Sequence, residues 1–290
     1  MNGFKRILVP TDLSEVARVE LDYALLFADT FGADLTLFYA DPMHFEFDPI
    51  TGAPVYVAGV TADERARLMR DVRAYAEKSL RARPYDVVVG AGDPVATITR
   101  EARETRTDLI VMATHGQRGW RRTAMGSVTE GVVHEAPCPV LSVARTDRRH
   151  GLTPGVTRVV CPVNFTDVAR ESLRTAASIA KMFACELVIA HVVETPDGTA
   201  GADETRVRSW VEPEVQSNCT YREIILRGGA AERILDYVED IEADLLVIGA
   251  QRKLFRDSTV IGTTTERMIR FARVPVLSVV RSAAAAAKAA

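Results

Sequence analysis

The segment RILVPTD at residues 6–12 returns as RVVCPVN at residues 158–164. Two further segments recur in the same order: DLIVM at 108–112 matches DLLVI at 244–248, and PVLSV at 139–143 is identical to 275–279. Self-similarity over a long period indicates that one structural unit occurs more than once. We therefore expect two copies of a single domain, each beginning and ending on one of these segments.

Short apolar runs alternate with helical patterns within each copy. Continuous runs such as ADLTLFYA at 33–40 are typical of strands buried on both faces of a parallel sheet. Residues 14–31 and 93–105 instead carry apolar side chains at helical spacing. This alternation predicts an α/β fold of two tandem five-stranded parallel-sheet αβα sandwich domains, Rossmann-like in topology. Ligands of such sheets bind beyond the carboxyl ends of the strands.

The chain of 290 residues has the length of two ordinary domains. The offset between matching residues falls from 152 (6 to 158) to 136 (108 to 244), so the first copy has about 16 additional residues. We assign them to Asp41–Thr61, which is rich in Pro, Gly and aromatic residues. The charges, Pro and Gly of TDRRHGLTPG suit an exposed join. The predicted organisation is a first domain at 1–145, a linker at 146–155, a second domain at 156–282 and an alanine-rich tail at 283–290.

The composition indicates a globular protein and excludes several other classes. A hydrophobic fraction of 47% and a charged fraction of 26% are those of an ordinary globular protein. The net charge of -3 gives no global attraction to nucleic acid or anionic lipid, so we expect neither as a partner. No apolar run approaches the length of a membrane span, the N-terminus lacks a signal-peptide layout, and the four cysteines lack CxxC spacing. We expect a cytoplasmic protein without a disulfide framework.

Polar residues follow the first predicted strand, in the turn Pro10-Thr11-Asp12. One interpretation is a turn in which Asp12 or Ser14 caps the next helix. The other is that Asp12, at the carboxyl edge of the sheet, accepts hydrogen bonds from a ribose or a base. The sequence leaves both open.

A glycine-rich segment follows the fourth strand, from Ala113 to Glu130. Its glycines allow close approach of the backbone to a ligand and positive φ, and Ser127 opens a helix whose first amide groups attract anions. Ser127-x-x-Glu130 is also a capping box, which alone accounts for a hydroxyl there. Capping does not account for the basic residues before it, Arg118, Arg121 and Arg122. They favour a loop that faces phosphate groups.

The spacing Ala113-x2-Gly116-x9-Gly126-Ser127 resembles the nucleotide-binding signature G-x2-G-x9-G-[S/T] of universal stress proteins. The resemblance implies an adenine nucleotide alpha hydrolase-like fold that binds ATP, with Mg²⁺ as its companion. It implies that Pro10, Thr11, Asp12 and the backbone near Ala40 hold adenosine. The phosphates would be surrounded by Met112, Ala113, His115, Gly116, Gly126, Ser127, Val128 and Thr129. Ala113 departs from the signature by one methyl group, which is tolerable where φ is negative.

The second copy departs further from the same signature. Gly249 supplies the first glycine, but Arg252 replaces the second, and Asn164 stands where Asp12 does. An arginine where the backbone should approach a ligand is expected to fill part of the pocket. We therefore expect a degenerate second site. An alternative is that Arg252, Lys253 and Arg256 bind an anion in a different pose, or simply form an exposed basic face.

Three classes of function remain. The first is an ATP-binding stress-response protein whose nucleotide lies mainly in the N-terminal domain and whose output is a change of conformation or partner. The second is a nucleotide-free interaction module in which PVLSV edge strands pair to build a dimer. The third is an enzyme, either a slow ATPase or a flavin-binding electron-transfer relative. Two fused domains also predict an intramolecular pseudo-dimer, from which a further homodimer is possible by symmetry.

Overall fold

The computed structural model describes residues 3–15, 18–41, 44–47, 51, 54–57, 61–80, 83–114, 125–144, 155–194, 200–211, 215, 219–250, 252–255, 258–261 and 263–280. The predicted linker at 146–155 lies outside this part of the chain except for its last residue, and the predicted tail at 283–290 lies wholly outside it.

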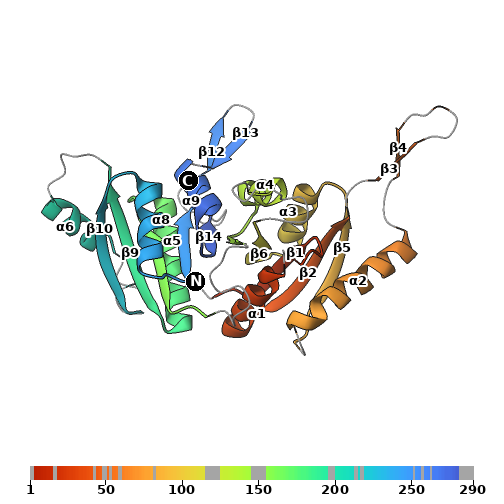
Figure 1. Cartoon of the computed structure of the whole chain (residues 1–290), viewed down its shortest axis with the longest axis horizontal. Coiled ribbons are helices and arrows are strands. Elements are labelled where there is room, and N and C mark those ends of the chain that lie inside the picture. Colours follow the sequence, from red (N-terminus) through yellow and green to blue (C-terminus); the bar gives the residue numbers. More distant parts are fainter. Residues whose placement is uncertain are drawn as a thin grey trace.

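The first half contains the expected alternation of strands and helices (Figure 1). Its elements are β1 (Arg6–Thr11), α1 (Val19–Phe31), β2 (Asp34–Asp41), β3 (His44–Phe47), β4 (Pro54–Val57), α2 (Ala62–Leu80), β5 (Asp86–Ala91), α3 (Pro94–Glu104), β6 (Leu109–Ala113), α4 (Ser127–Glu135) and β7 (Val140–Val143). The hairpin of β3 and β4 falls within the predicted insertion and stands away from the body of the domain.

The second half repeats the main alternation of strands and helices, but its hairpin, β12 and β13, lies between β11 and α9. Its elements are β8 (Arg158–Pro162), α5 (Asp167–Phe183), β9 (Glu186–Val193), α6 (Ala200–Trp210), β10 (Tyr221–Arg227), α8 (Ala230–Asp240), β11 (Leu245–Gly249), β12 (Arg252–Phe255), β13 (Ser258–Ile261), α9 (Thr263–Phe271) and β14 (Val276–Val279). The five strands of each half's main sheet run parallel to one another. The predicted pair of five-stranded αβα domains is therefore confirmed.

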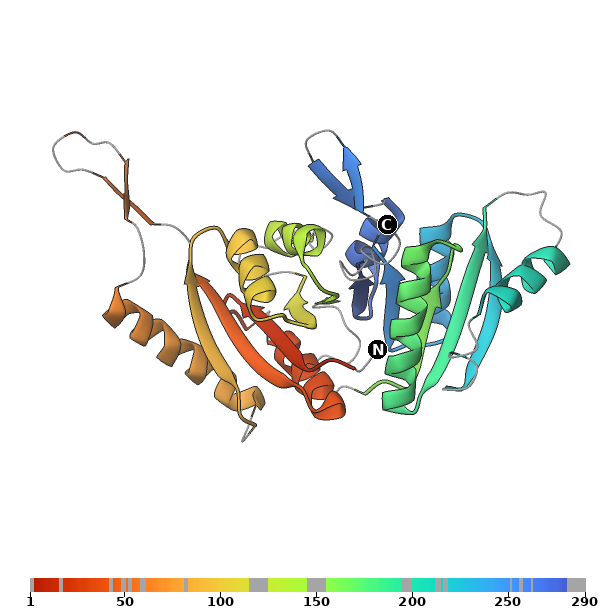
Figure 2. The ribbon, with the colours of Figure 1, turned by 180° about the vertical axis from the view of Figure 1, so that it is seen from behind.

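The two main sheets form one ten-stranded sheet in the order β10-β9-β8-β11-β14-β7-β6-β1-β2-β5. The halves meet where β14 pairs with β7 in antiparallel fashion, the single change of direction in this sheet. Leu277 lies opposite Leu141, flanked by the pairs Val276–Ser142 and Ser278–Val140. Matching residues thus exchange places across a local two-fold axis, as in an isologous dimer interface. Figure 2 shows this seam from behind, and the predicted intramolecular pair is confirmed.

Aromatic packing reinforces the seam on one face of the sheet. Phe183 of α5 lies 5.5 Å from Phe27 and 6.1 Å from Phe31 of α1, measured between ring centroids. Phe27 is fully buried. Because burying a large aromatic side chain contributes roughly 1.5–3 kcal/mol, this cluster adds substantially to the contact between the halves.

The repeated DL-containing segments are explained by one hydrogen-bonding arrangement. Asp108 Oδ2 accepts hydrogen bonds of 3.0 Å from the amides of both Lys5 and Arg6. Asp244 Oδ2 accepts equivalent bonds from the amides of Thr157 and Arg158, at 2.6 and 3.0 Å. Each aspartate therefore anchors the segment that enters the first strand of its half, which aligns the carboxyl ends of the central strands.

The helices begin differently in the two halves. We expected the first helix to run from residue 14, but α1 begins at Val19, with Arg18 as its N-cap residue. Its counterpart α5 begins at Asp167, which corresponds to Glu15, and Thr166 caps it. In the part of the chain that the structure describes, no helix is both long and apolar enough to span a membrane.

Candidate functional site

Three adjacent strands, β6, β1 and β2, bring most of the predicted nucleotide residues to one edge of the N-terminal sheet. Pro10 and Thr11 end β1, Met112 and Ala113 end β6, and Ala40 lies near the end of β2. The chain order of the strands reverses at β1, since β2 lies on one side of it and β6 on the other. This is the position at which open α/β sheets form ligand crevices.

Helix α4 contributes its N-terminus to this edge. Gly126 is the N-cap residue, Ser127 is the first residue of the helix, and no side chain in the described part of the chain caps it. The capping box expected from Ser127 and Glu130 is therefore wrong, because the hydroxyl lies one position too far along the helix. Ser127 is exposed and Val128 is half-buried. The first amide groups of α4 are left without an intrahelical acceptor, so they retain the positive end of the helix dipole.

Two hydrogen bonds hold α4 against the end of β6. Thr129, which is 4% exposed, donates through Oγ1 to the carbonyl of Ala113 at 2.8 Å. The amide of Gly126 donates to the carbonyl of Thr114 at 2.8 Å. A Cβ atom at Gly126 would lie 3.3 Å from that carbonyl oxygen, closer than side chains normally approach. Close approach thus explains this glycine, whose φ of -62° is not the positive value that we expected.

Asp12 has a local structural role at the same edge. Its Oδ1 accepts a hydrogen bond of 3.0 Å from the amide of Ser14, and the side chain is exposed. Leu13, between them, has a φ of 62°. The interpretation of Asp12 or Ser14 as the cap of α1 is wrong, because Arg18 is the N-cap residue. The turn instead presents the Asp12 carboxylate beyond the end of β1.

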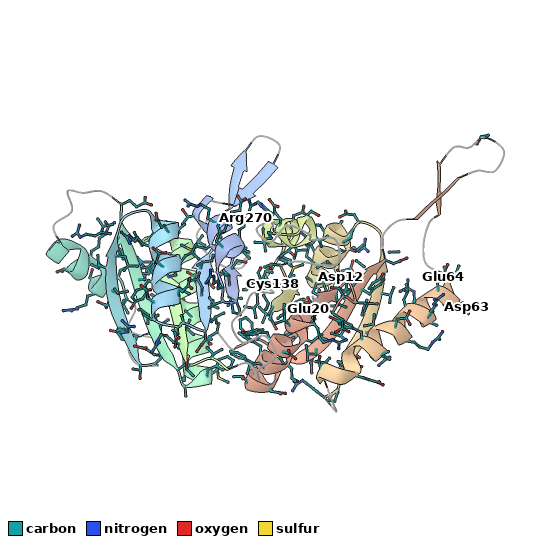
Figure 3. The ribbon with its side chains drawn as sticks, in the orientation of Figure 1. Asp12, Glu20, Asp63, Glu64, Cys138 and Arg270 are labelled. Carbon is teal, nitrogen blue, oxygen red and sulfur yellow. The ribbon has the colours of Figure 1, made fainter. Side chains whose placement is uncertain are left out.

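Glu20 of α1 is a site residue that the sequence analysis missed. It is 1% exposed, and its Oε2 accepts a hydrogen bond of 2.8 Å from the amide of Ala113. Burial raises the pKa of the Glu20 carboxyl well above its ordinary range; the bonds from Ala113 and the Thr11 hydroxyl lower it in part, and the charge of Asp12 raises it. Figure 3 shows Glu20 and Asp12 in the same region of the N-terminal half. Helical spacing from Glu20 to the buried Ala24 and Phe27 was the available signal.

Three predicted phosphate residues, His115, Gly116 and Arg118, lie outside the described residues, as do Arg121 and Arg122. The described part of the candidate site is therefore the strand ends, the turn at Asp12, the buried Glu20 and the first turn of α4. The roles of the three residues stay predictions.

The equivalent crevice of the C-terminal half contains a cavity of about 230 Å³. It lies between the ends of β8, β9 and β11 and the starts of α5, α8 and α9, with Asn164, Glu194 and Gly249 in its lining. We expected the side chain of Arg252 to fill part of this pocket. The structure describes the backbone of Arg252 but not its side chain. The segment that carries it forms the hairpin of β12 and β13, and β13 contacts α4 of the other half.

The polar groups of this second crevice bond to one another. The Thr166 hydroxyl donates to Asn164 Oδ1 at 2.7 Å and accepts from the amide of Ala169 at 3.2 Å. Glu194 Oε1 accepts from the amide of Ala230, at the start of α8, at 3.2 Å. A carboxylate at that helix N-terminus disfavours a second anion there.

Comparison with known proteins finds matches to both halves of the chain. The model of the universal stress protein family matches twice, at residues 3–144 and 155–280. A universal stress protein of Methanocaldococcus jannaschii is 31% identical over 149 residues, which cover 50% of this chain and 84% of the relative. One from Thermus aquaticus is 33% identical over 144 residues, covering 48% and 98% respectively. The crystal structure of a universal stress protein from Archaeoglobus fulgidus covers 95% of this chain and 98% of its own, with a TM-score of 0.70 and 24% identity.

Proposed function

The chain belongs to the universal stress protein family, and from this premise we propose that it is a stress-response regulatory protein that binds ATP in its N-terminal half. The adenosine lies near Asp12 and Ala40, and the phosphates lie on the first turn of α4 and on the glycine-rich segment before it. The output is a change of conformation or of partner rather than a chemical product.

One observation carries the proposal. Among the residues that the structure describes, no side chain caps the first turn of α4, and Ser127 at its start is exposed, at the same sheet edge as the turn of Asp12. Uncapped amide groups with the helix dipole behind them suit a polyanion. In the other half, a carboxylate already occupies the N-terminus of α8, the helix that corresponds to α3, because Glu194 accepts a hydrogen bond from the amide of Ala230.

Magnesium fits this proposal as a companion of the nucleotide. The described residues contain no group of three or more His, Cys, Asp or Glu side chains that could hold a metal ion. Mg²⁺ commonly keeps several waters and binds through one or two carboxylates plus substrate phosphates. In this chain Asp12, beyond the end of β1, and Asp41, at the end of β2, are carboxylates at the proposed edge, and the ion would supply charge neutralisation for the phosphates.

The alternative of a nucleotide-free module built by pairing of edge strands has less support. The two PVLSV strands pair with each other inside one chain. Both are therefore interior strands of the ten-stranded sheet, and a homodimer would have to use another surface.

Calorimetric titration of ATP into the wild type and two variants tests the proposal. Gly116→Arg copies Arg252 of the second half, and Ser127→Asp adds a negative charge to the first turn of α4. We expect each to weaken ATP binding by at least about tenfold, whereas an Asp at a helix start favours the helix itself by roughly 0.3–1 kcal/mol. Thr263→Asp, at the matching position of α9, is the control and should leave the affinity unchanged.

Equal affinity in wild type and both variants would overturn the proposed location of the phosphates. A wild type that gives no heat with ATP and carries no nucleotide would favour the interaction module. Yellow colour on purification, or steady phosphate release, would favour the enzyme class.

A further inference from the structure

We infer that Glu20 is a positioning residue of the N-terminal site. Its carboxyl group holds the amide of Ala113 and thereby fixes the position of the first turn of α4, where the nucleotide phosphates bind. This inference rests on the proposed function. It concerns a residue that lies outside the universal stress protein signature and is supplied by α1.

Ala113 is held from both sides. Its amide donates to Glu20 Oε2 at 2.8 Å, and its carbonyl accepts from Thr129 Oγ1 at 2.8 Å. These two bonds connect α1 to α4 through a single residue at the end of β6. A shift of Ala113 would therefore be transmitted to the helix N-terminus.

The second half contains only one of these two connections. Thr265 donates to the carbonyl of Gly249 at 3.1 Å, as Thr129 does to Ala113. The residue that corresponds to Glu20 is Ser172, whose hydroxyl donates to the carbonyl of Ala169 within the same helix at 2.9 Å. The fold thus forms without a carboxyl group at this position, and the bond from α1 to the signature is specific to the N-terminal half.

Glu20 also lowers the stability of the fold in one respect, which argues against a purely structural role. Its Oε1 is buried and has no hydrogen-bond partner among the described residues. A buried polar atom left unsatisfied costs about 1–3 kcal/mol. A small or apolar residue would avoid that cost, so the carboxyl group is explained better by what it holds than by the stability that it adds.

The groups around Glu20 favour the neutral, protonated form of its carboxyl group. Among the described residues, the titratable groups that act on Glu20 or are acted on by it are Asp12, after β1, and Tyr75 of α2. The Arg18 guanidinium, 4.6 Å from the centre of the Tyr75 ring, faces that tyrosine. Burial and Asp12 raise the pKa of Glu20, while β6 presents the Ala113 amide. Ionised Glu20 would put a second negative charge beside Asp12 under the proposed phosphates.

The test uses the full chain with Glu20→Gln, Glu20→Ser and, as the matched control, Ser172→Ala. Glutamine keeps the acceptor and stays neutral at every pH, whereas serine copies the second half. Amide hydrogen exchange at Ala113 is measured together with ATP affinity by calorimetry, from low pH upward until Glu20 ionises. We expect Glu20→Ser to speed exchange at Ala113 and to weaken ATP binding by about tenfold, in line with the loss of a buried hydrogen bond. Glu20→Gln and Ser172→Ala should match the wild type at the pH where Glu20 is protonated.

The pH profile separates positioning from simple packing. As pH rises and Glu20 ionises, we expect the wild type to lose ATP affinity and Glu20→Gln to keep it. Stability should follow the same direction: a carboxyl whose pKa is raised in the folded state contributes fully below its unfolded pKa, and this contribution is lost as pH rises toward the folded pKa. The gain in stability of Glu20→Gln over the wild type should therefore grow with pH.

The outcomes distinguish the two proposals. If the wild type does not bind ATP, the proposed function fails, and exchange at Ala113 still decides whether Glu20 holds that residue. If the wild type binds ATP but Glu20→Ser binds equally well with unchanged exchange, this inference alone is overturned. A wild type that keeps its ATP affinity at a pH where Glu20 is ionised would also contradict it.

Discussion

The two halves of the chain share one backbone plan but differ at the edge where ligands bind. The contacts that build each sheet are duplicated: Asp108 and Asp244 anchor the entering strands, and Leu141 and Leu277 face each other at the seam. The groups at the crevices are not. A turn with an exposed carboxylate and a buried Glu20 occur in the first half. In the second half Asn164 and Glu194 are bonded to their own neighbours. The contacts that the halves share are those that build the sheets, and the contacts that differ lie at the crevices.

The largest expected effect concerns the shared seam. Leu141→Ala and Leu277→Ala each remove a fully buried side chain from the same pair of opposed residues. Each should lower the free energy of unfolding by about 2–5 kcal/mol. Urea denaturation of both variants measures this, and clearly unequal losses would show that the seam is less symmetric than its register.

The next effect concerns the first position of the signature, where the halves differ by one methyl group. A Cβ atom on Gly249 would lie 2.8 Å from Val168 Cγ1 and 3.1 Å from the Val168 carbonyl oxygen, at the start of α5. Gly249→Ala should therefore destabilise the second half by roughly 1–3 kcal/mol. Ala113→Gly, its mirror image, should cost no more than about 1 kcal/mol. Thermal unfolding of both variants measures the two losses of stability. If Gly249→Ala caused no loss, the start of α5 would be able to shift away from the added methyl group.

A third prediction attempts to convert the second crevice into the first. Asn164→Asp with Arg252→Gly restores the charge and the glycine of the N-terminal half. An acceptor with a charge strengthens a hydrogen bond by about 1 kcal/mol, so we expect ATP to bind the second half about tenfold more tightly than before. Calorimetric stoichiometry measures it, with Asn164→Asp alone as the control. If the number of bound nucleotides does not rise, other residues closed this pocket.

The smallest effect tests a difference inside the seam itself. Ser278 Oγ donates to the carbonyl of Val140 at 3.1 Å, whereas the matching Ser142 Oγ is buried and has no partner in the part of the chain that the structure describes. Ser278→Ala should cost about 0.5–1.5 kcal/mol, and Ser142→Ala should be neutral or slightly stabilising. Chemical denaturation of the two single variants checks the sign, and equal losses would contradict the assigned bonding.

The fold could be predicted from the repeated segments and the apolar runs, because both can be read from the sequence without knowledge of tertiary contacts. Residues 10–12 and 126–129 were assigned to one sheet edge for the same reason, since parallel strands end together. The N-cap of α4 was not predictable: Ser127 fits a capping box, and only the backbone path puts Gly126 in that position. Glu20 was missed because a glutamate on an otherwise apolar helical stripe is normally exposed, and its burial depends on Ala113, 93 residues away along the chain.

The pairing of β7 with β14 also determines how the assembly responds to dilution. Two separate one-domain chains joined by such a strand pair would come apart as their concentration falls, because their association is bimolecular. Joining the halves in one chain replaces that dependence by an effective concentration, which short linkers set in roughly the millimolar range. The asymmetric pair of crevices therefore stays together whatever the copy number of the protein in a cell.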